Sequence, residues 1–290
     1  HIMNNKNTLS HRGQEPENGV LYIVGTPIGN LNDMSPRAIN ILRNVNLIAC
    51  EDTRNTKKIM NTFCIKNNIT SFNEYNSNTK TKEILAYLNN DKSVALVSDA
   101  GMPLICDPGE ELITKCRQNK LEVVCVPGPC AAITAITSSG FHSSKFLFLG
   151  FLPRKGKERE KLLNQIKKNT ISTILYESPH RLHKLLKELK EYCGGDRKIH
   201  IARELTKKFE EHINSDIDNI INIFEEREYK GEFCIIVKGN NIKKLDLIDK
   251  NKLREELFFL VNNGLSLSKA SKYLAKKNNL TKKFIYNLNE

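Results

Sequence analysis

The stretch VALVSDAGMPLICDPG, residues 94–109, joins four apolar residues to twelve that include two Asp, two Gly and two Pro. The four apolar residues predict a short buried strand. A connection between a strand and a helix usually takes about two to six residues, so a connection this long predicts a loop shaped around a ligand. We expect Asp107 to cap a helix that begins at Pro108.

Short apolar runs of the same kind recur along the chain and alternate with stretches of helical periodicity. One helix should have Ser35 as its N-cap and Pro36 in its first turn. We expect strands at residues 20–25, 46–50, 93–98, 121–126, 145–150, 172–177, 198–203 and 232–239. This alternation is typical of an α/β protein whose mainly parallel sheet is covered by helices on both faces. Hairpin-like neighbours near residues 209–213 predict a mixed sheet in the second half.

Composition divides the chain into four parts. Residues 1–19 are polar, and we interpret them as a tag scar followed by a disordered N-terminus. Residues 20–150 and 151–241 should form two α/β lobes, because Pro153 and a basic, Gly-containing stretch follow a strand that ends near Gly150. Residues 242–290 should form a small helical extension, since apolar residues recur there at helical spacing around a glycine turn.

The chain carries 45 basic and 33 acidic residues, a net charge of +12. This excess favours a polyanionic partner, because Lys and Arg side chains that face phosphates release counterions on binding. A solvated basic surface without a partner is the alternative. The extension is itself basic, and two short helices around a glycine are typical of a helix-turn-helix. An RNA contact and a packing appendage both remain open for it.

Several functional classes are excluded by what the sequence lacks. No apolar run approaches the roughly 18–20 residues of a membrane span. The eight cysteines include no CxxC pair, which argues against a metal site and favours reduced thiols in the cytoplasm. The patterns GxGxxG, GxxxxGK[ST] and GxSxG are also missing, which argues against a dinucleotide-binding fold, a P-loop and a serine hydrolase.

Four unusual segments directly follow predicted strands: TPIGN (26–30), EDTR (51–54), SDAGMPLICDPG (98–109) and PGPCA (127–131). In an open α/β sheet, ligands bind beyond the carboxyl ends of the strands. Asp99 and Asp107 can accept hydrogen bonds from an ammonium group or a ribose, and Gly and Pro allow close backbone approach. Plain turn chemistry explains any one of these loops. Four of them on one rim predict a site for a nucleotide-like cofactor.

Longer motifs occur in a fixed order: LYIVGTPIGNLND (21–33), ACEDTR (49–54), residues 94–109, VPGPCAAITAITSSG (126–140), FLFLGFLPRK (146–155), YESPHRL (176–182), IARELTKKFEE (201–211) and KGEF (230–233). In these motifs, from about Val20 to Gly239, the chain resembles the ribosomal RNA small subunit methyltransferase I family of the tetrapyrrole methylase superfamily. The tail LSLSKASKYLAKKNNLTKKFIY (265–286) is similar to the C-terminal extension of many members.

The resemblance implies two α/β lobes of the tetrapyrrole methylase type with a cofactor cleft between them. It implies an enzyme that uses S-adenosylmethionine to methylate the ribose 2′-hydroxyl of a cytidine in the decoding region of small-subunit (16S) rRNA. The substrate would be rRNA within the assembled small ribosomal subunit. The resemblance also implies a homodimer. The expectation of a cytoplasmic protein with no membrane partner and no metal rests on the apolar runs and the cysteine pattern described above.

Carried over by position, the resemblance assigns cofactor contacts to three of these four loops and to the second lobe. The implied residues are Pro27, Asp99, Ala100, Gly101, Met102, Gly128, Cys130, Ala131, Tyr176, Ala202, Arg203 and Phe233. Two positions depart from the family pattern. Cys130 stands where the family often has Ser, and a thiol is the weaker hydrogen-bonding group. The stretch FNEYNSN (72–78) replaces a segment in which relatives commonly have His, so we assign no catalytic histidine there.

Methyl transfer is a displacement in which positioning supplies much of the rate, and a base would assist loss of the hydroxyl proton. Our candidate catalytic residues are Glu51, Asp52, Arg54 and Lys207, with Glu177 and Glu204 as further candidates. The alternative for several of these side chains is an ion pair that holds a loop in place.

For RNA contacts we expect basic side chains in and near the FLPRKGKERE segment. These are Arg154, Lys155, Lys157, Arg159 and Arg181. A solvated linker is the alternative interpretation of that segment. Two other functions also stay open at this point: methylation of a tetrapyrrole intermediate, and an RNA-binding assembly factor that has lost methyl transfer. The high basic charge argues against a small acidic macrocycle as the substrate.

Overall fold

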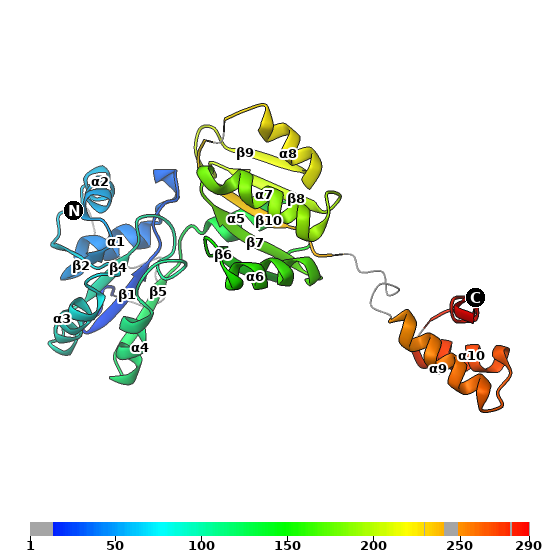
Figure 1. The fold of residues 1–290 in the computed structure, drawn as a ribbon. Helices are drawn as coiled ribbons and strands as arrows, with labels where there is room; N and C mark the ends of the chain where they lie inside the picture. The colour runs from blue at the N-terminus through cyan, green and yellow to red at the C-terminus, as the bar shows by residue number, and fades with distance from the viewer. Residues whose placement is uncertain (1–13, 229, 241–248, 279, 290) are drawn as a thin grey trace. The chain divides into compact units, whose positions relative to one another are not determined.

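The computed structural model describes residues 14–228, 230–240, 249–278 and 280–289. The expected tag scar and most of the expected disordered N-terminus lie outside these residues. The chain divides into two compact units, one ending at Gly239 and one starting at Asn240 (Figure 1). The first unit contains two five-stranded sheets flanked by helices, which confirms the predicted α/β fold class.

The first sheet is entirely parallel, with strand order β3-β2-β4-β1-β5. Its strands are β1 (Val20–Val24), β2 (Leu47–Cys50), β3 (Ile69–Ser71), β4 (Val94–Val97) and β5 (Glu122–Val126), and the chain between them forms η1 (Leu31–Asp33), α1 (Pro36–Asn44), α2 (Thr53–Thr62), α3 (Ser77–Asn89) and α4 (Glu110–Gln118). Strand β3 and helix α2 were not among the predicted elements, because the three residues of β3 carry two polar side chains and no apolar run.

Strand residues of alternating parity point to opposite faces of this sheet, and each face has its own core. Tyr22 packs on one face with Ile41 of α1 and Met60 of α2. Leu21 packs on the other face with Ile84 of α3. Since both faces are buried, β1, β2 and β4 are continuous apolar runs rather than alternating ones.

The second sheet is mixed, with strand order β6-β7-β10-β8-β9. The β6–β7 pair is parallel, whereas β10 is antiparallel to both β7 and β8, and β8 is antiparallel to β9. Its elements are α5 (Ala131–Ser138), β6 (Phe146–Phe151), α6 (Lys157–Lys168), β7 (Ser172–Glu177), α7 (Pro179–Cys193), β8 (Lys198–Arg203), β9 (Glu211–Asp216), α8 (Ile217–Glu225) and β10 (Phe233–Val237). The predicted mixed sheet is thereby confirmed.

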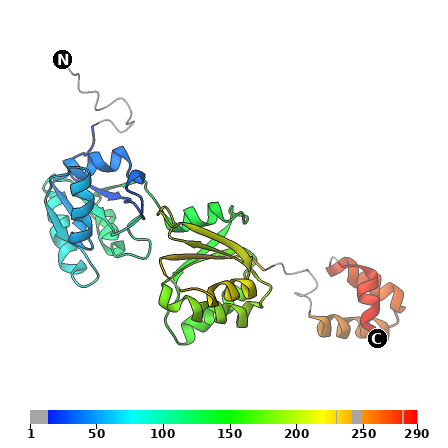
Figure 2. The ribbon, with the colours of Figure 1, turned by 90° about the horizontal axis from the view of Figure 1, so that it is seen from above.

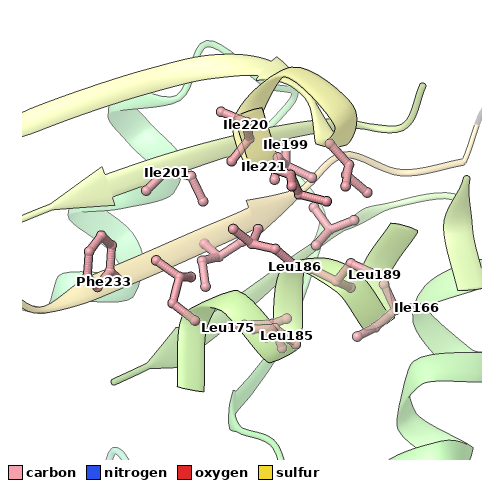
Figure 3. Close-up of a cluster of buried hydrophobic side chains, with 14 of the residues drawn as sticks. Ile166, Leu175, Leu185, Leu186, Leu189, Ile199, Ile201, Ile220, Ile221 and Phe233 are labelled. Carbon is pink, nitrogen blue, oxygen red and sulfur yellow. The ribbon is translucent and has the colours of Figure 1, made fainter. Parts of the chain in front are cut away.

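Helices also cover both faces of the second sheet (Figure 2). Helices α6, α7 and α8 bury one face in a large aliphatic core, where Leu185 and Leu189 of α7 meet Ile199 of β8 and Ile220 of α8 (Figure 3). On the other face lies α5, which begins at the last residue of the PGPCA segment. The sheet therefore holds its strand ends in fixed positions from both sides.

The passage from the first sheet to the second differs from the predicted lobe boundary near residue 150. Strand β6 belongs to the second sheet, and so does α5, whose Ala132 and Ile136 pack against Ile174 and Ile236. Gly150 and Pro153 follow a strand as expected, but that strand is already the first one of the second sheet. Sequence pattern could locate the strand, and only packing shows to which sheet it belongs.

The predicted helix cap at Asp107 is wrong. Helix α4 begins at Glu110, and its N-cap is Gly109, with φ of 139° and no side-chain cap. Gly109 lets the backbone turn into the helix, and its missing Cβ leaves room for Leu96 and Leu104. Asp107 is therefore released from capping and lies on the wall of a cavity.

The second unit consists of the helices α9 (Lys250–Asn262), α10 (Leu267–Asn278) and α11 (Lys282–Tyr286), with the 3-10 turn η2 (Asn287–Asn289) (Figure 1, orange to red). Leu257 of α9, Leu274 of α10 and Ile285 of α11 form a core of its own. The predicted helical extension is thus present. Across the described parts of the chain, no helix combines the length and apolarity that crossing a membrane requires.

Gly25 and Gly128 bring the loops after β1 and β5 into direct backbone contact. A Cβ atom on Gly128 would lie 2.7 Å from the Cα atom of Gly25. A Cβ atom on Gly25 would lie 2.6 Å from the Cα atom of Gly128 and equally close to the Met102 sulfur. Neither distance is possible for a real side chain, so both positions require glycine.

We therefore predict that Gly128→Ala lowers the free energy of unfolding of the first unit by about 1–3 kcal/mol, the usual range for overpacking. Hydrogen exchange in the β1 and β5 amides should speed up accordingly. Gly264→Ala is the control: its φ of 96° disfavours alanine, but the added Cβ meets nothing within 4 Å and any strain falls in the second unit, so exchange in β1 and β5 should not change. Unchanged exchange in Gly128→Ala would contradict the contact.

Candidate functional site

A cavity of about 520 Å³ opens where loops of the two sheets meet. Ile28, Glu51 and Asp99 reach it from the ends of β1, β2 and β4. Tyr176 and Ala202 reach it from near the ends of β7 and β8. Strand β10 runs antiparallel to these two strands, so its first residue, Phe233, joins the same edge. The cavity thus lies at the carboxyl edge of the parallel strands, where α/β proteins bind ligands.

The loop that follows β4 is held against the loop that follows β1. Thr26 and Gly101 exchange two backbone hydrogen bonds of 3.0 Å, and the Ser98 hydroxyl donates to the Gly101 carbonyl. Gly101 has φ of 79°, and a Cβ there would approach Ile28 and the Pro129 carbonyl. This wall of the cavity is therefore built from backbone, which allows a ligand to contact N–H and C=O groups directly.

Two loops beside the cavity contain backbone strain. Leu104 and Cys106, in the loop after β4, have φ values of 70° and 68°. Glu204 and Thr206, in the loop after β8, have φ values of 52° and 69°. Residues with a Cβ pay about 1–2 kcal/mol for this conformation. Such strain persists where the surrounding structure imposes a particular loop shape, and it gathers at functional sites.

Three carboxyl groups share one side of the cavity: Glu51, Asp99 and Asp107. Burial, followed by the charges of Glu51 and Asp99, raises the pKa of Asp107 to about 6. Burial and the charges of Asp99 and Asp52 also raise the pKa of Glu51. These groups repel one another when ionised. A cationic ligand would relieve that repulsion, so the electrostatics of this wall favour a positive charge.

Glu177, the last residue of β7, presents a carboxylate on another part of the wall. Its Oε1 accepts hydrogen bonds from the Ser178 amide at 2.8 Å and is paired with Arg181 Nε at 3.0 Å. Its Oε2 is buried and has no hydrogen-bond partner within the described residues. A buried carboxylate oxygen without a donor is costly, and this one belongs to a residue that lines the cavity.

The remaining wall is apolar and aromatic. Tyr176 stacks edge-on against Phe148 and Phe151, with ring centroids 5.2 and 5.7 Å apart. The Tyr176 hydroxyl accepts a hydrogen bond from the Ala132 amide at 3.0 Å, which ties β7 to the first turn of α5. Tyr176 and Phe151 offer ring surface to a flat ligand group. The ring of Phe233 instead packs edge-on against Phe224 in the core on the other face of the sheet.

Most of the residues predicted to contact a cofactor come together in this cavity. Those that line it are Asp99, Ala100, Gly101, Met102, Cys130, Ala131, Tyr176, Ala202 and Phe233. Pro27 is buried behind the wall, and Gly128 is occupied by its contact with Gly25. Arg203 does not line the cavity. Its guanidinium donates to the Lys230 carbonyl at 2.6 Å.

Several wall residues were absent from the predicted cofactor set: Ile28, Ile105, Cys106, Asp107, Phe151, Glu177, Ser178, Pro179, Leu205, Glu232 and Cys234. Asp107 and Glu177 were predicted from the sequence in other roles, Asp107 as a helix cap and hydrogen-bond acceptor and Glu177 as a further catalytic candidate. The apolar ones had none, because an apolar residue on a cavity wall has the same sequence pattern as one in the core.

The four candidate catalytic residues occupy different surroundings. Glu51 lines the cavity. Asp52 is the N-cap of α2 and pairs with Arg54 at 2.7 Å, and hydrogen bonds from Arg54 lower the pKa of Asp52 to about 2. Lys207 is held by Glu232 at 2.7 Å and Glu204 at 3.2 Å. Burial would lower the pKa of Lys207, but the hydrogen bonds that its ammonium group donates to both carboxylates outweigh burial, and the pKa is raised.

The basic residues predicted to contact RNA also separate. Arg154, Lys155 and Lys157 are exposed around the start of α6. Arg181 is half-buried in its pair with Glu177. The prediction for Arg159 is contradicted by its burial: it is only 4% exposed, pairs with Glu188 of α7 and donates to the Pro153 carbonyl at 2.7 Å. Helical spacing turns Arg159 inward, where it fixes the turn between β6 and α6.

Two α/β sheets share a cavity at their strand ends, and comparison with known protein families identifies the class of protein with this arrangement. Residues 20–221 match the model of the tetrapyrrole (corrin/porphyrin) methylases, and the chain belongs to this family. Cobalt precorrin-4 methyltransferase has the same fold, with a TM-score of 0.56 at 14% identity over 76% of this chain and 95% of that one. Uroporphyrin-III C-methyltransferase from Thermus thermophilus gives a TM-score of 0.52 at 15% identity, over 76% and 94%.

The more similar relatives carry a more specific name. The chain is 42% identical to ribosomal RNA small subunit methyltransferase I of Synechocystis over 270 residues, which cover 93% of this chain and 97% of that protein. It is 40% identical to the protein of that name from Bacillus subtilis, over 92% and 93%. Identity reaches 47% with the Thermotoga maritima protein of that name, over 76% of this chain and 99% of that one.

The structural role of Arg159 leads to a stability prediction. Glu188→Ala should lower the free energy of unfolding by about 2–3 kcal/mol, because it leaves a buried guanidinium without its carboxylate. Glu83→Ala is the matched control. Its partner Lys80 lies 2.6 Å away in a more exposed pair, which should contribute about 0.5 kcal/mol or less. Urea denaturation measures both, and equal effects would contradict the role assigned to Arg159.

Proposed function

We propose that this protein is an S-adenosylmethionine-dependent methyltransferase that acts on the 2′-hydroxyl of a cytidine ribose in the decoding region of small-subunit (16S) rRNA. The observation that carries the reaction class is the carboxylate-lined cavity in a member of a methylase family. The near full-length similarity to proteins named ribosomal RNA small subunit methyltransferase I supports the substrate.

The residues of the cavity fit S-adenosylmethionine. Its sulfonium and ammonium groups carry positive charge, which Asp99 and Asp107 would neutralise. The backbone of residues 99–102 would meet the polar methionine end, and the rings of Tyr176 and Phe151 would contact the flat adenine. A volume of about 520 Å³ also lies within the range of small-molecule sites.

When bound, this cofactor supplies an electrophilic methyl group, and the protein's contribution is to position and deprotonate the acceptor. Asp52 and Arg54 neutralise one another, and Lys207 is kept protonated by two carboxylates. We therefore place the base at Glu51, whose pKa is raised by burial and by Asp99. The Oε2 of Glu177 is a second acceptor for a donor on the ligand.

The exposed residues Arg154, Lys155 and Lys157 are our candidates for holding the RNA backbone near the cavity. Phe151, which lines the cavity, lies on the same turn and is 50% exposed. A basic segment that begins beside a ligand cavity suits a polyanionic substrate. Arg159 is left out of this group because of its burial.

We also propose that the protein works in the cytoplasm as a homodimer on the assembled small subunit. Exposed Ile133, Phe151 and Phe209 offer apolar surface for a second copy. Sedimentation equilibrium would measure the mass of the particle, and a monomer at micromolar concentration would contradict the dimer.

Transfer of labelled methyl groups tests the function directly. Small ribosomal subunits that lack the modification should accept label on a cytidine 2′-oxygen in the decoding region. Naked rRNA and a tetrapyrrole precursor would be tested beside them. Label in the tetrapyrrole alone would move the protein to the other branch of its family, and cofactor binding without any transfer would indicate an assembly factor.

The raised pKa of Asp107 predicts a pH dependence of cofactor binding. A cation stabilises the ionised carboxyl group, so binding should release a proton near pH 6. Affinity for S-adenosylmethionine should therefore rise by up to about tenfold between pH 5 and pH 7. Calorimetry in buffers of different ionisation enthalpy measures both quantities. Asp107→Asn should bind more weakly and lose the dependence; if it keeps the same proton release, another group titrates.

Neutralising Arg154 and Lys155 should weaken binding to rRNA and reduce the slope of log affinity against log salt by about 1–1.5, as expected for two phosphate contacts on a single strand. The control is Lys82→Ala with Lys115→Ala, two exposed lysines on α3 and α4. Filter binding across a salt series measures the slopes. An unchanged slope in the Arg154 and Lys155 variant would refute the assignment.

A further inference from the structure

The core of the second unit is formed by side chains that face its interior, so its outer surface does not take part in that core. Leu253, Leu257, Leu274 and Ile285 bury their side chains against one another inside this unit. The match to the methylase family ends at residue 221, so the unit also lies outside the part of the chain that defines the family. Its surface is therefore free to serve a purpose other than folding or methyl transfer.

One face of α10 carries a basic stripe, which we define as Lys269, Lys272, Tyr273 and Lys276. These residues follow the spacing i, i+3, i+4 and i+7, so they share one side of the helix. All four are exposed, and Tyr273 is 55% exposed. The apolar residues of α10, including Leu274, face the core instead.

Nearby lysines have a polar or acidic partner, whereas the lysines of the basic stripe form no ion pair within the described residues. Lys277 pairs with Glu256 of α9 at 3.0 Å, and Lys282 donates to the Ser268 hydroxyl at 2.7 Å. No ion pair involves the three stripe lysines within the described residues of the unit. Like charges one helical turn apart destabilise a helix slightly, so the stripe gains most from an external anion.

The acids of the second unit lie elsewhere. In residues 249–278 and 280–289 they are Asp249, Glu255 and Glu256, all on α9 or at its N-cap. The same residues include eight Lys and one Arg, among them Lys282 and Lys283 at the start of α11. Positive charge is thus concentrated on α10 and α11, with exposed Tyr273 and Tyr286 among the lysines.

We propose that the basic stripe of α10 is a second RNA site, which binds phosphates through its lysines and stacks a base on Tyr273. Lysines interleaved with an exposed aromatic ring are the combination that single-stranded RNA binding uses. A membrane fits less well, because the stripe offers no large aliphatic side chain for insertion. The choice of RNA over an acidic protein rests on the proposed function.

The test uses the full chain and a 30-nucleotide single-stranded RNA of mixed sequence, without S-adenosylmethionine. Replacing Lys269, Lys272 and Lys276 by Ala should weaken binding about tenfold or more at 0.1 M salt and reduce the salt slope by about 2. Alanine keeps helix propensity high, so the fold should persist. The control replaces Lys82, Lys115 and Lys120, three exposed lysines in the part of the chain that forms the first sheet. It should leave the slope nearly unchanged.

Tyr273→Leu gives an independent measurement. Loss of base stacking should weaken binding about fivefold while the salt slope stays constant, since no charge is removed. An unchanged affinity and slope in the lysine variant would overturn the proposal. So would tighter binding of the wild type to phosphatidylserine vesicles or to poly-glutamate than to the RNA.

The same set of proteins separates this inference from the proposed function. Methyl transfer to small subunits is measured in parallel, and binding is measured without cofactor. A wild-type protein that transfers no methyl group but loses RNA affinity in the stripe variant would retain the RNA site and lose the proposed function. If the wild type transfers methyl groups normally and the stripe variant binds RNA as the wild type does, the proposed function is retained and the second RNA site is refuted.

Discussion

The close backbone contact between the loops after β1 and β5 is the constraint on which the site depends. Gly25 and Gly128 approach so nearly that neither can carry a side chain, and Thr26 is paired by two hydrogen bonds with Gly101. Three loops that are far apart in the sequence are thereby fixed on one edge of the first sheet. Helix α5 begins shortly after Gly128 and packs on the second sheet. The same contact therefore also fixes the point at which the chain passes from the first sheet to the second. Side chains on both walls of the cavity are placed relative to this framework.

The chemistry of the cavity follows from how poorly its charges are compensated. Asp107 is raised in pKa by burial and by its acidic neighbours, and Glu177 has a buried oxygen without a donor. Elsewhere on the rim, charges are matched within the protein, as in the pair of Asp52 with Arg54 and the contacts of Lys207 with two glutamates. Groups of the second kind hold loops in shape, whereas groups of the first kind favour a ligand of opposite charge or with a free donor. This contrast separates binding residues from structural ones more sharply than residue type does.

Positive charge is used in three distinct ways along the chain. Arg159 is buried and locks the turn before α6 through Glu188. Arg154 and its neighbours are exposed close to residues of the cavity wall, and the lysines of the basic stripe stand on a separately folded unit. Net charge alone treats these as one property. Their surroundings divide them into a structural group and two candidate surfaces for a polyanion.

The sequence by itself determined the α/β class, the family and every strand except β3 and β9, because apolar runs and long loop motifs are local properties of the chain. It also predicted nine of the cavity-lining residues through the resemblance. Only the tertiary structure decided that β6 and α5 belong to the second sheet, since an apolar face does not name its partner. It likewise turned Arg159 inward, left Arg203 off the cavity wall and showed that Asp107 does not cap α4. The direction of a side chain depends on what packs around it, and contacts between residues distant in sequence leave no local pattern to read.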